Sequence, residues 1–304
     1  MQSAPAKTLT IGSRGSQLAL WQAHHIAGLL ERCGVGTRIT VIKTTGDHLQ
    51  TASLTAAGGK GLFTKEIEEA LLAGAIDLAV HSLKDLPTET PAGLQIAAIP
   101  EREDPRDALV GKRLDELTPG SRVGTSSSRR AAQLRALRSD LSIEAVRGNV
   151  DTRLRKLKEG QYDAVLLAAA GLRRLGLASE IAQVLEPDLM CPAPGQGALA
   201  IQTRLGDDTA GLSDFLNHEA SFQAVTCERA ALATLGGGCQ LPVGAFAQLI
   251  NGTLHLMVVV VAPDGSKLLR AAGQDAPREA SVLGAQVGRE LLDRGAGQIL
   301  SAAR

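Results

Sequence analysis

This sequence has few aromatic residues and no excess of either charge. Aromatic side chains make up 2% of the 304 residues, and 32 Lys and Arg balance 32 Asp and Glu, so the formal net charge is zero. Non-specific nucleic-acid binding relies on a basic surface and on aromatic stacking, so this composition argues against it. The hydrophobic content of 44% is ample for buried cores, and the length fits two or three domains.

Long apolar runs and paired cysteines are missing too. No apolar run is long enough to span a membrane, and residues 1–8 lack the apolar core of a secretory signal. The four cysteines show no C-x-x-C spacing, so neither a disulfide framework nor a zinc site is expected. We therefore expect a cytoplasmic protein that binds no metal and has neither a membrane nor a nucleic acid as a partner.

The first part of the chain alternates strand-like and helix-like patterns. Strands are predicted at residues 9–12, 37–44, 76–81, 121–124, 141–146 and 162–169. Between them the apolar spacing predicts helices after Ser16 and at residues 64–72, 129–137, 149–158 and 172–175. This β-α-β alternation implies mainly parallel sheets that are covered on both faces.

The last part of the chain has a different pattern, typical of a small antiparallel α+β domain. Its predicted elements are strands at residues 243–250, 253–261 and 267–271 and a helix at about 280–294. The first two strands are joined by Asn251 and Gly252, a strong hairpin signal. Earlier in the chain, proline-containing segments at residues 100–107 and 191–197 interrupt the alternation, and the first is a predicted crossing between domains.

Polar side chains gather where the predicted strands end, which is the edge at which open α/β sheets bind ligands. Asp85 follows the strand at 76–81, and its carboxylate is suited to acid–base work; a helix-cap or turn aspartate is the alternative. Residues 124–130 bring hydroxyls, backbone N–H groups at a helix start and two guanidiniums together, which indicates an anion site. The alternative there is a serine cap with solvated arginines.

Arginines recur at successive strand ends, which is the feature that favours a binding cleft over a solvated face. The polar residues that follow strands elsewhere are Arg14, Ser16, Arg147, Arg153, Arg173 and Arg174. Such a set predicts a ligand with several carboxylates or phosphates. Residues 58–63 are interpreted as a mobile lid loop or simply a flexible connection, and Trp21 is expected in the core.

Cys239 stands on an unusual backbone, because residues 236–238 before it are all glycine. Glycine adopts positive φ easily, so this thiol can be directed outward, and Pro242 stiffens the exit. The pattern indicates a thiol to which something attaches. An ordinary free cysteine after a Schellman-type helix cap is the alternative.

These segments together resemble the porphobilinogen deaminase family, also called hydroxymethylbilane synthases. The matching segments are SRGS at 13–16, LALWQA at 18–23, GGKGLF at 58–63, AVHSLKD at 79–85, EREDPRD at 101–107, VGTSSSRR at 123–130, RGNV at 147–150, AGLRRLGL at 170–177, GQGA at 195–198 and GGCQ at 237–240. The similarity covers nearly the whole chain in order. Each motif alone is weak, but the set is highly specific.

The resemblance implies an α/β protein of three domains, of which two are periplasmic-binding-protein-like. The expected boundaries are 1–101 with 198–217 returning for domain 1, 102–197 for the arginine-rich domain 2, and 218–304 for the small C-terminal α+β domain with an antiparallel sheet. It also implies a monomer with a dipyrromethane cofactor in thioether linkage to Cys239. Four porphobilinogen molecules would be joined head to tail with loss of ammonia, and hydrolysis would release hydroxymethylbilane for porphyrin and heme biosynthesis.

The roles of the residues are carried over from the resemblance. Asp85 is expected to be catalytic, assisting ammonia loss and accepting the pyrrole α-proton. Besides Asp85 and Cys239, the expected cofactor-binding residues are Ser82, Lys84, Thr125, Ser126, Ser127, Arg129, Arg130 and Arg147. The expected substrate-binding residues are Arg14, Ser16, Lys60, Arg153, Arg174 and Gln196.

The chain departs from the family pattern at Ser128 and Cys191, where leucine is usual, and neither change removes a group that the reaction needs. Two other function classes are the alternatives. A two-lobed anion- or solute-binding module would share the cleft but would need neither Cys239 nor a third domain. A cysteine-nucleophile hydrolase would need a histidine that activates Cys239, and nothing near it in the sequence supplies one.

Overall fold

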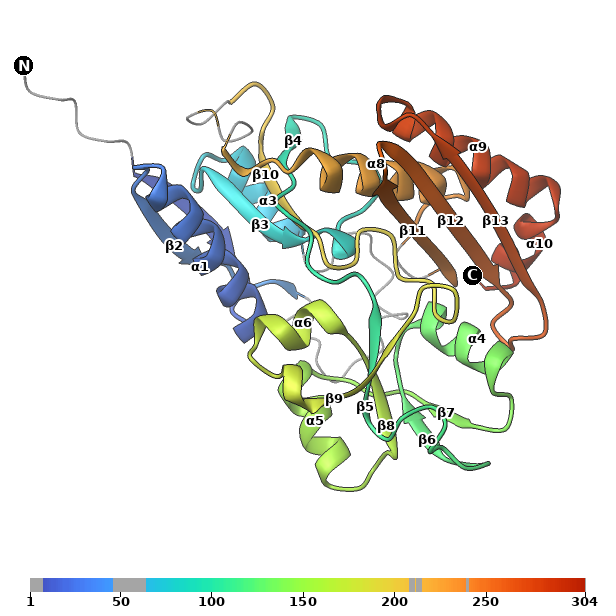
Figure 1. Cartoon of the computed structure of the whole chain (residues 1–304). Helices are drawn as coiled ribbons and strands as arrows, with labels where there is room; N and C mark the ends of the chain where they lie inside the picture. The colour runs from blue at the N-terminus through green and yellow to red at the C-terminus, as the bar shows by residue number, and fades with distance from the viewer. Residues whose placement is uncertain (1–7, 46–63, 208–210, 212–214, 239–240, 304) are drawn as a thin grey trace, which may run out of the picture. The chain divides into compact units, whose positions relative to one another are not determined.

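The computed structural model describes residues 8–45, 64–207, 211, 215–238 and 241–303. The chain divides into two compact units (Figure 1). Unit 1 comprises residues 1–102 and 198–222, and unit 2 comprises residues 103–197 and 223–304.

Unit 1 is built on a five-stranded sheet of order β2-β1-β3-β10-β4. Its strands are β1 (Leu9–Ser13), β2 (Thr37–Val41), β3 (Leu78–Ser82), β4 (Leu94–Ala98) and β10 (Leu199–Arg204). Helix α1 (Gln17–Arg32) packs on one face through Ile26 and Leu30, while α3 (Lys65–Leu72) packs on the other through Ile67 and Leu71. Alternate residues of β3 therefore enter opposite cores, as a sheet buried on both faces requires.

Unit 2 contains a second five-stranded sheet, of order β7-β6-β8-β5-β9. Its strands are β5 (Asp107–Gly111), β6 (Arg122–Gly124), β7 (Ser142–Glu144), β8 (Ala164–Ala168) and β9 (Ile181–Leu185). Leu134 of α4 (Ser128–Leu137) enters the core on one face. Leu154 of α5 (Val150–Lys158) and Leu172 of α6 (Ala169–Arg174) enter the core on the other.

The two sheets share one topology, and it corrects the expectation of mainly parallel sheets. In each, three parallel strands are followed by a fourth that runs antiparallel to both of its neighbours, β10 in unit 1 and β5 in unit 2. These fourth strands lie where the chain passes between the units, so no crossover helix sets their direction. The sequence analysis predicted no strand at either place.

The rest of unit 2 is a three-stranded antiparallel sheet with helices. Its strands are β11 (Val243–Ile250), β12 (Thr253–Val261) and β13 (Leu268–Asp275), and its helices are most of α8 (Glu219–Thr234), α9 (Ala280–Asp293) and α10 (Ala296–Ala302). A one-turn 3₁₀ helix at Pro277–Glu279 precedes α9. Similar turns occur earlier in the chain at Leu83–Asp85 and Ala178–Glu180. Asn251 and Gly252 have φ of 49° and 79°, the type I′ geometry of a two-residue hairpin. Gly284 lets α9 approach α8 so closely that a Cβ would lie 2.2 Å from the Cys227 carbonyl.

The fold-class prediction is confirmed, with two α/β sheets of like topology and a C-terminal antiparallel sheet with helices.

The expectation for Trp21 was wrong. Its side chain is 36% exposed and stacks on His25 with ring centroids 5.0 Å apart. Position 21 lies on the outer side of α1, while Gln22 and Ala23 point inward. No helix among the described residues has the length and apolar character needed to cross a membrane.

Candidate functional site

In unit 1 the structure brings two of the predicted groups to one edge of the sheet. Strands β1 and β3 are parallel neighbours, so Arg14 and Ser16 after β1 share an edge with the predicted residues that follow β3. Asp85 is the last residue of the 3₁₀ turn Leu83–Asp85 and is exposed. An exposed carboxylate on a short turn is accessible to a ligand at this edge, as an acid–base role requires.

Two hydroxyls at this edge have structural partners. The Ser16 side chain caps α1 by accepting from the Ala19 N–H at 3.2 Å. The Ser82 hydroxyl accepts from Gln22 Nε2 at 2.9 Å. Sequence reasoning missed Gln22, although a buried glutamine on the apolar face of a helix is a signal that it has a polar partner.

His81, at the end of β3, is a buried imidazole beside the predicted catalytic turn. Its side chain is 6% exposed, and its Nε2 has no hydrogen-bond partner among the described residues. Burial lowers the pKa of His81 to about 4, the nearby Arg14 charge acts in the same direction, and Gln202 opposes it. His81 is therefore neutral at physiological pH, and Arg14 brings the positive charge to this edge.

In unit 2 the predicted residues Thr125, Ser126 and Ser127 hold the loop that follows β6 through backbone and hydroxyl hydrogen bonds. The Thr125 N–H donates to the Glu144 carbonyl at 2.8 Å, and the Ser126 hydroxyl donates to the Val146 carbonyl at 2.7 Å. Ser127 is the N-cap of α4, and its hydroxyl accepts from the Arg130 N–H at 3.4 Å. The loop is therefore fixed on both sides, and the start of α4 has a defined direction.

Arg129 and Arg130, at the start of α4, lie inside unit 2. They are 4% and 6% exposed, so the alternative of solvated arginines is wrong. Both guanidiniums donate to Asp107, which is fully buried. Burial alone would raise the pKa of Asp107, but the two guanidiniums and the Gln196 amide hold it well below its usual range.

Sequence reasoning gave Asp107 no role, because it treated residues 100–107 as a crossing between domains and residues 101–107 as a matching segment. The signal was an acid at the end of that segment, just before an apolar run. Gln196, predicted to bind substrate, donates through Nε2 to Asp107 Oδ1 at 2.8 Å and is 1% exposed. The structure thus joins three predicted residues around one carboxylate that was not predicted.

Two further guanidiniums in unit 2 are desolvated. Arg153 Nε donates to the Gly148 carbonyl at 2.8 Å, and Arg174 Nη2 donates to the Gly197 carbonyl at 2.7 Å. Burial lowers the pKa of each to about 10, and the Arg130 charge also lowers that of Arg153. A bound anion would offset this cost of desolvation, so both side chains suit a ligand that carries carboxylates.

Arg147 differs from these two because it is exposed. It follows β7, the parallel neighbour of β6, so it lies on the same sheet edge as the loop of residues 125–127. An exposed guanidinium there is accessible to an anion, although in water it contributes less than a desolvated one.

The glycines before Cys239 have the conformations that the sequence predicted. Gly236, Gly237 and Gly238 have φ of 101°, 56° and 126°. The Gly237 N–H bonds to the Leu232 carbonyl and the Gly236 N–H to the Ala233 carbonyl, which is a Schellman cap at the end of α8. Cys239 itself, Lys60 and the loop of residues 58–63 lie outside the described residues.

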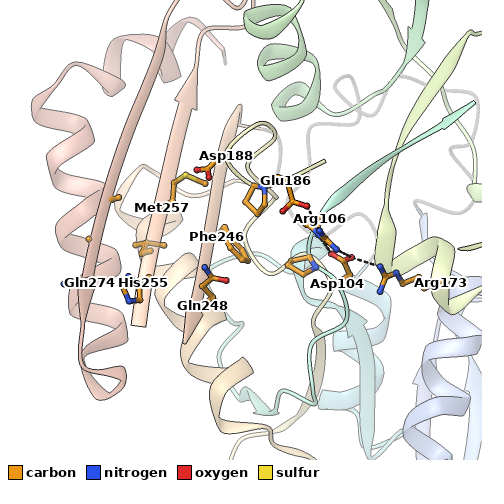
Figure 2. Close-up of a pocket in the computed structure, with 15 residues that line it drawn as sticks. Asp104, Arg106, Arg173, Glu186, Asp188, Phe246, Gln248, His255, Met257 and Gln274 are labelled. Atoms are coloured by element: carbon orange, nitrogen blue, oxygen red, sulfur yellow. Dashed lines mark hydrogen bonds and ion pairs between the residues drawn. The ribbon is translucent and has the colours of Figure 1, made fainter. Parts of the chain in front are cut away.

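A groove of about 1050 Å³ in unit 2 is lined by Arg173 but by no other residue of the predicted strand-end set. Figure 2 shows one wall formed by Phe246, Gln248, His255, Met257 and Gln274 of the antiparallel sheet. On the other wall, Asp104 binds both Arg106 and Arg173 at 2.9 Å. Among the strand-end residues, only Arg173 thus takes part in this groove. No group of metal-ligating side chains occurs in the described part of the chain.

Comparison with known proteins decides the family. Residues 9–211 match the family described as "Porphobilinogen deaminase, dipyromethane cofactor binding domain", and residues 222–293 match "Porphobilinogen deaminase, C-terminal domain". The chain belongs to the porphobilinogen deaminase family. It is 49% identical to the porphobilinogen deaminase of Syntrophobacter fumaroxidans, over 97% of both chains. It is 47% identical to that of Syntrophomonas wolfei, over 98% of this chain and 99% of the relative.

Among solved structures, the methionine-binding protein MetQ matches with a TM-score of 0.42 and 15% identity, over 67% of this chain and 85% of its own. A periplasmic substrate-binding protein from Coxiella burnetii matches with a TM-score of 0.41 and 14% identity, over 66% and 87%. Family membership confirms the predicted deaminase of tetrapyrrole biosynthesis and its dipyrromethane cofactor. The alternative of an anion- or solute-binding module is not favoured.

Proposed function

We propose that the strand-edge residues of unit 2 bind the carboxylates of cofactor and substrate in this porphobilinogen deaminase, and that those of unit 1 supply its acid–base chemistry. The observation that carries the proposal is the pair of desolvated guanidiniums, Arg153 and Arg174, which donate to the Gly148 and Gly197 carbonyls. Porphobilinogen carries an acetate and a propionate, so each added unit brings two more carboxylates. Buried guanidiniums stabilise such groups by charge-assisted hydrogen bonds.

The residues present fit a dipyrromethane cofactor, because that group also bears carboxylates. In unit 2, Thr125, Ser126, Ser127 and the exposed Arg147 supply hydroxyls and charge at the ends of neighbouring parallel strands. In unit 1, Ser82 and Lys84 adjoin Asp85. When bound, the cofactor supplies the pyrrole α-carbon to which each new unit is joined. Two groups of predicted residues complete the proposed set. On the cofactor side they are Arg129 and Arg130, and on the substrate side they are Arg14, Ser16, Lys60 and Gln196.

Asp85 is the proposed catalytic residue. An ionised carboxylate on an exposed turn can stabilise the positive charge that develops as ammonia leaves. The same oxygen atoms can then accept the proton from the pyrrole α-carbon after the new bond forms. The neutral His81 beside it adds no competing charge at physiological pH.

We further propose that Cys239 carries the cofactor. The proposed domains are residues 1–101 together with 198–217, residues 102–197, and residues 218–304. The protein is proposed to act as a cytoplasmic monomer. The three glycines with positive φ support the first point, because they leave the backbone before Cys239 without side-chain cover, whereas the Schellman cap is common to this proposal and to the ordinary-cysteine alternative. Sedimentation velocity of the purified chain would test the oligomeric state.

The intact mass of the purified protein tests the proposed function. We expect a mass above that of the sequence by two linked pyrrole units, all of it on Cys239. Cys239→Ser should lose the adduct. Cys33→Ser, Cys191→Ser and Cys227→Ser should keep it, because Cys191 and Cys227 are buried and burial raises the pKa of both thiols. An unmodified mass in an active preparation would contradict the proposal.

A further inference from the structure

One carboxylate, Asp107, lies at the centre of the buried arginine cluster. It is the first residue of β5 and is fully buried. Its Oδ2 accepts from Arg129 Nη1 at 2.7 Å, while its Oδ1 lies 2.9 Å from Arg130 Nε and 2.7 Å from Arg130 Nη2. A carboxylate that receives two guanidiniums in a buried site holds both in defined orientations.

Charge shows why the cluster needs this residue. Asp107 carries one negative charge and the two arginines carry two positive charges, so these three side chains together hold a surplus of one. Arg153 is close enough that the Arg130 charge acts on it. Without Asp107, three cations would lie near one strand edge in a poorly solvated environment, and their repulsion would move the arginines apart.

The same network reaches residues 103–107, by which the chain enters the five-stranded sheet region of unit 2, and residues 191–197, by which it leaves that region. Gln196 Nε2 donates to the Pro105 carbonyl at 2.7 Å as well as to Asp107. Arg129 Nη1 donates to the Cys191 carbonyl at 2.7 Å. A shift of residues 103–107 or of residues 191–197 would therefore be transmitted to the start of α4.

We propose that Asp107 is a positioning residue of the carboxylate-binding site. It orients Arg129 and Arg130 and ties them to residues 103–107 and 191–197, so that the loop of residues 125–127 keeps the arrangement that receives the cofactor. Asp107 itself touches neither cofactor nor substrate. This inference rests on the proposed function, and it adds a residue whose effect is exerted through others.

The test uses Asp107→Asn in the full chain, with three measurements. They are the fraction of molecules that carry cofactor by intact mass, kcat and KM for porphobilinogen per loaded molecule, and Tm. We expect the loaded fraction to fall about tenfold and KM to rise about tenfold, while kcat changes less than about threefold. Loading and KM change because the site is misaligned, whereas kcat is retained because Asp107 does not touch the reacting atoms.

A charge-balanced variant separates positioning from simple stability. Asp107→Asn combined with Arg130→Met removes one negative and one positive charge, so the net charge of the cluster is unchanged. We expect Tm to recover towards wild type, while loading stays low because the oriented guanidinium is gone. The matched control is Asp140→Asn, which breaks the exposed pair between Asp140 and Arg138 and should leave all three measurements unchanged.

Two results would overturn the proposal. One is wild-type loading and KM in Asp107→Asn. The other is a double variant that regains loading together with Tm, which would make Asp107 a purely structural charge partner. Where Asp107→Asn fails to fold, the double variant decides. A wild-type chain without an adduct on Cys239 would instead contradict the proposed function itself.

Discussion

At the scale of single residues, burial decides how the ionisable groups of this protein behave. Asp107 is fully buried yet ionised, because two guanidiniums share it. His81 is buried beside Arg14 and is neutral. Asp85, which is proposed to do the chemistry, is exposed and sits on a short turn. The residues that support the site are thus inside, while the proposed catalytic group is accessible.

We predict that Asp85→Asn folds and keeps its cofactor but loses nearly all turnover. The amide is close in shape to the carboxylate, and position 85 is exposed, so packing survives while negative charge and proton acceptance are lost. General acid–base groups contribute about 10²–10⁴ in rate, and one group that serves several steps would contribute more. Steady-state kinetics on mass-verified holoenzyme measures this, with Glu69→Gln on α3 as the exposed control. Turnover within a few fold of wild type would return Asp85 to the turn-aspartate interpretation.

We predict that His81 makes the protein less stable as the pH falls from about 6.5 to about 4. The folded-state pKa of about 4 lies below the ordinary histidine value of 6.5, so the unfolded chain binds the proton first in this window. The loss approaches about 3 kcal/mol at the acid end. His81→Gln should flatten the curve of Tm against pH in this range. Five aspartates also have a pKa below their ordinary value of 3.8, so their effect on stability falls mainly below this window; they are Asp104, Asp107, Asp140, Asp163 and Asp264. An unchanged slope in the variant would contradict the prediction.

At the scale of elements, the ends of the helices place the functional groups. Helix α4 starts at the loop after β6 because Ser127 caps it, and its first turn carries Arg129 and Arg130. Helix α8 ends in a Schellman cap that leads through three glycines to Cys239. In both cases a local rule of capping sets where the chain turns, and the buried arginines or the proposed cofactor cysteine follow directly in the sequence.

We predict that the arginines act at different stages. Arg129→Leu or Arg130→Leu should yield mostly apo-protein, because each leaves Asp107 short of a partner and disturbs the start of α4. Arg174→Leu should keep the cofactor but stall with partial chains attached, because Arg174 donates to the Gly197 carbonyl, whereas the guanidiniums that pair with Asp107 are those of Arg129 and Arg130. Native mass spectrometry after addition of porphobilinogen distinguishes them. The same distribution of bound pyrroles in all three variants would mean that the site is one undivided set of charges.

We predict that two glycines in turns of the antiparallel sheet respond differently to alanine. Gly252 and Gly265 have φ of 79° and 80°, but a Cβ on Gly252 meets open space, whereas one on Gly265 would lie 2.5 Å from the Ala136 N. Gly252→Ala should cost about 1 kcal/mol from backbone strain alone. Gly265→Ala should cost about 2–4 kcal/mol, because α4 would also have to move. Urea unfolding measures both, and equal costs would show that this turn does not dock on α4.

At the scale of the whole molecule, each unit depends on strands or segments that arrive from distant parts of the sequence. Residues 199–204 complete the sheet of unit 1 after the chain has built most of unit 2. Within unit 2, Glu228 of α8 is fully buried and accepts from the Gly195 N–H at 2.7 Å and from the Ala247 N–H at 2.8 Å. This one side chain thus joins α8 to β11 and to the segment of residues 191–197.

We predict that Glu228→Gln lowers the stability of the protein by about 2–3 kcal/mol. The amide retains one acceptor oxygen, but its NH₂ group faces a backbone N–H that loses its partner inside the core. Calorimetry should show a Tm lower by several degrees. Glu290→Gln on α9 is the control, since its pair with Arg294 is exposed and contributes about 0.5 kcal/mol or less. A shift no larger than that of the control would show that the Glu228 contacts contribute little.

The sequence by itself determined the local features of this protein. The Ser16 cap, the Asn251–Gly252 hairpin and the positive φ of the glycines before Cys239 were all predicted, because caps, turns and helical or strand periods depend on residues a few positions apart. The order of polar motifs along the chain was equally sufficient to indicate the family. The strand-edge positions followed from the alternation of strands and helices.

Only the tertiary structure decided which groups meet. The antiparallel direction of β5 and β10 depends on the path of the chain between the units, which no local pattern encodes. Asp107 and Gln196 are 89 positions apart, so their contact arises from strand order and not from spacing. Trp21 was expected inside and lies outside, because which side of a helix is buried depends on the sheet it packs against. The neutral state of His81 and the enclosure of Arg129 and Arg130 both depend on how the chain packs around them, and this packing exists only in the folded protein.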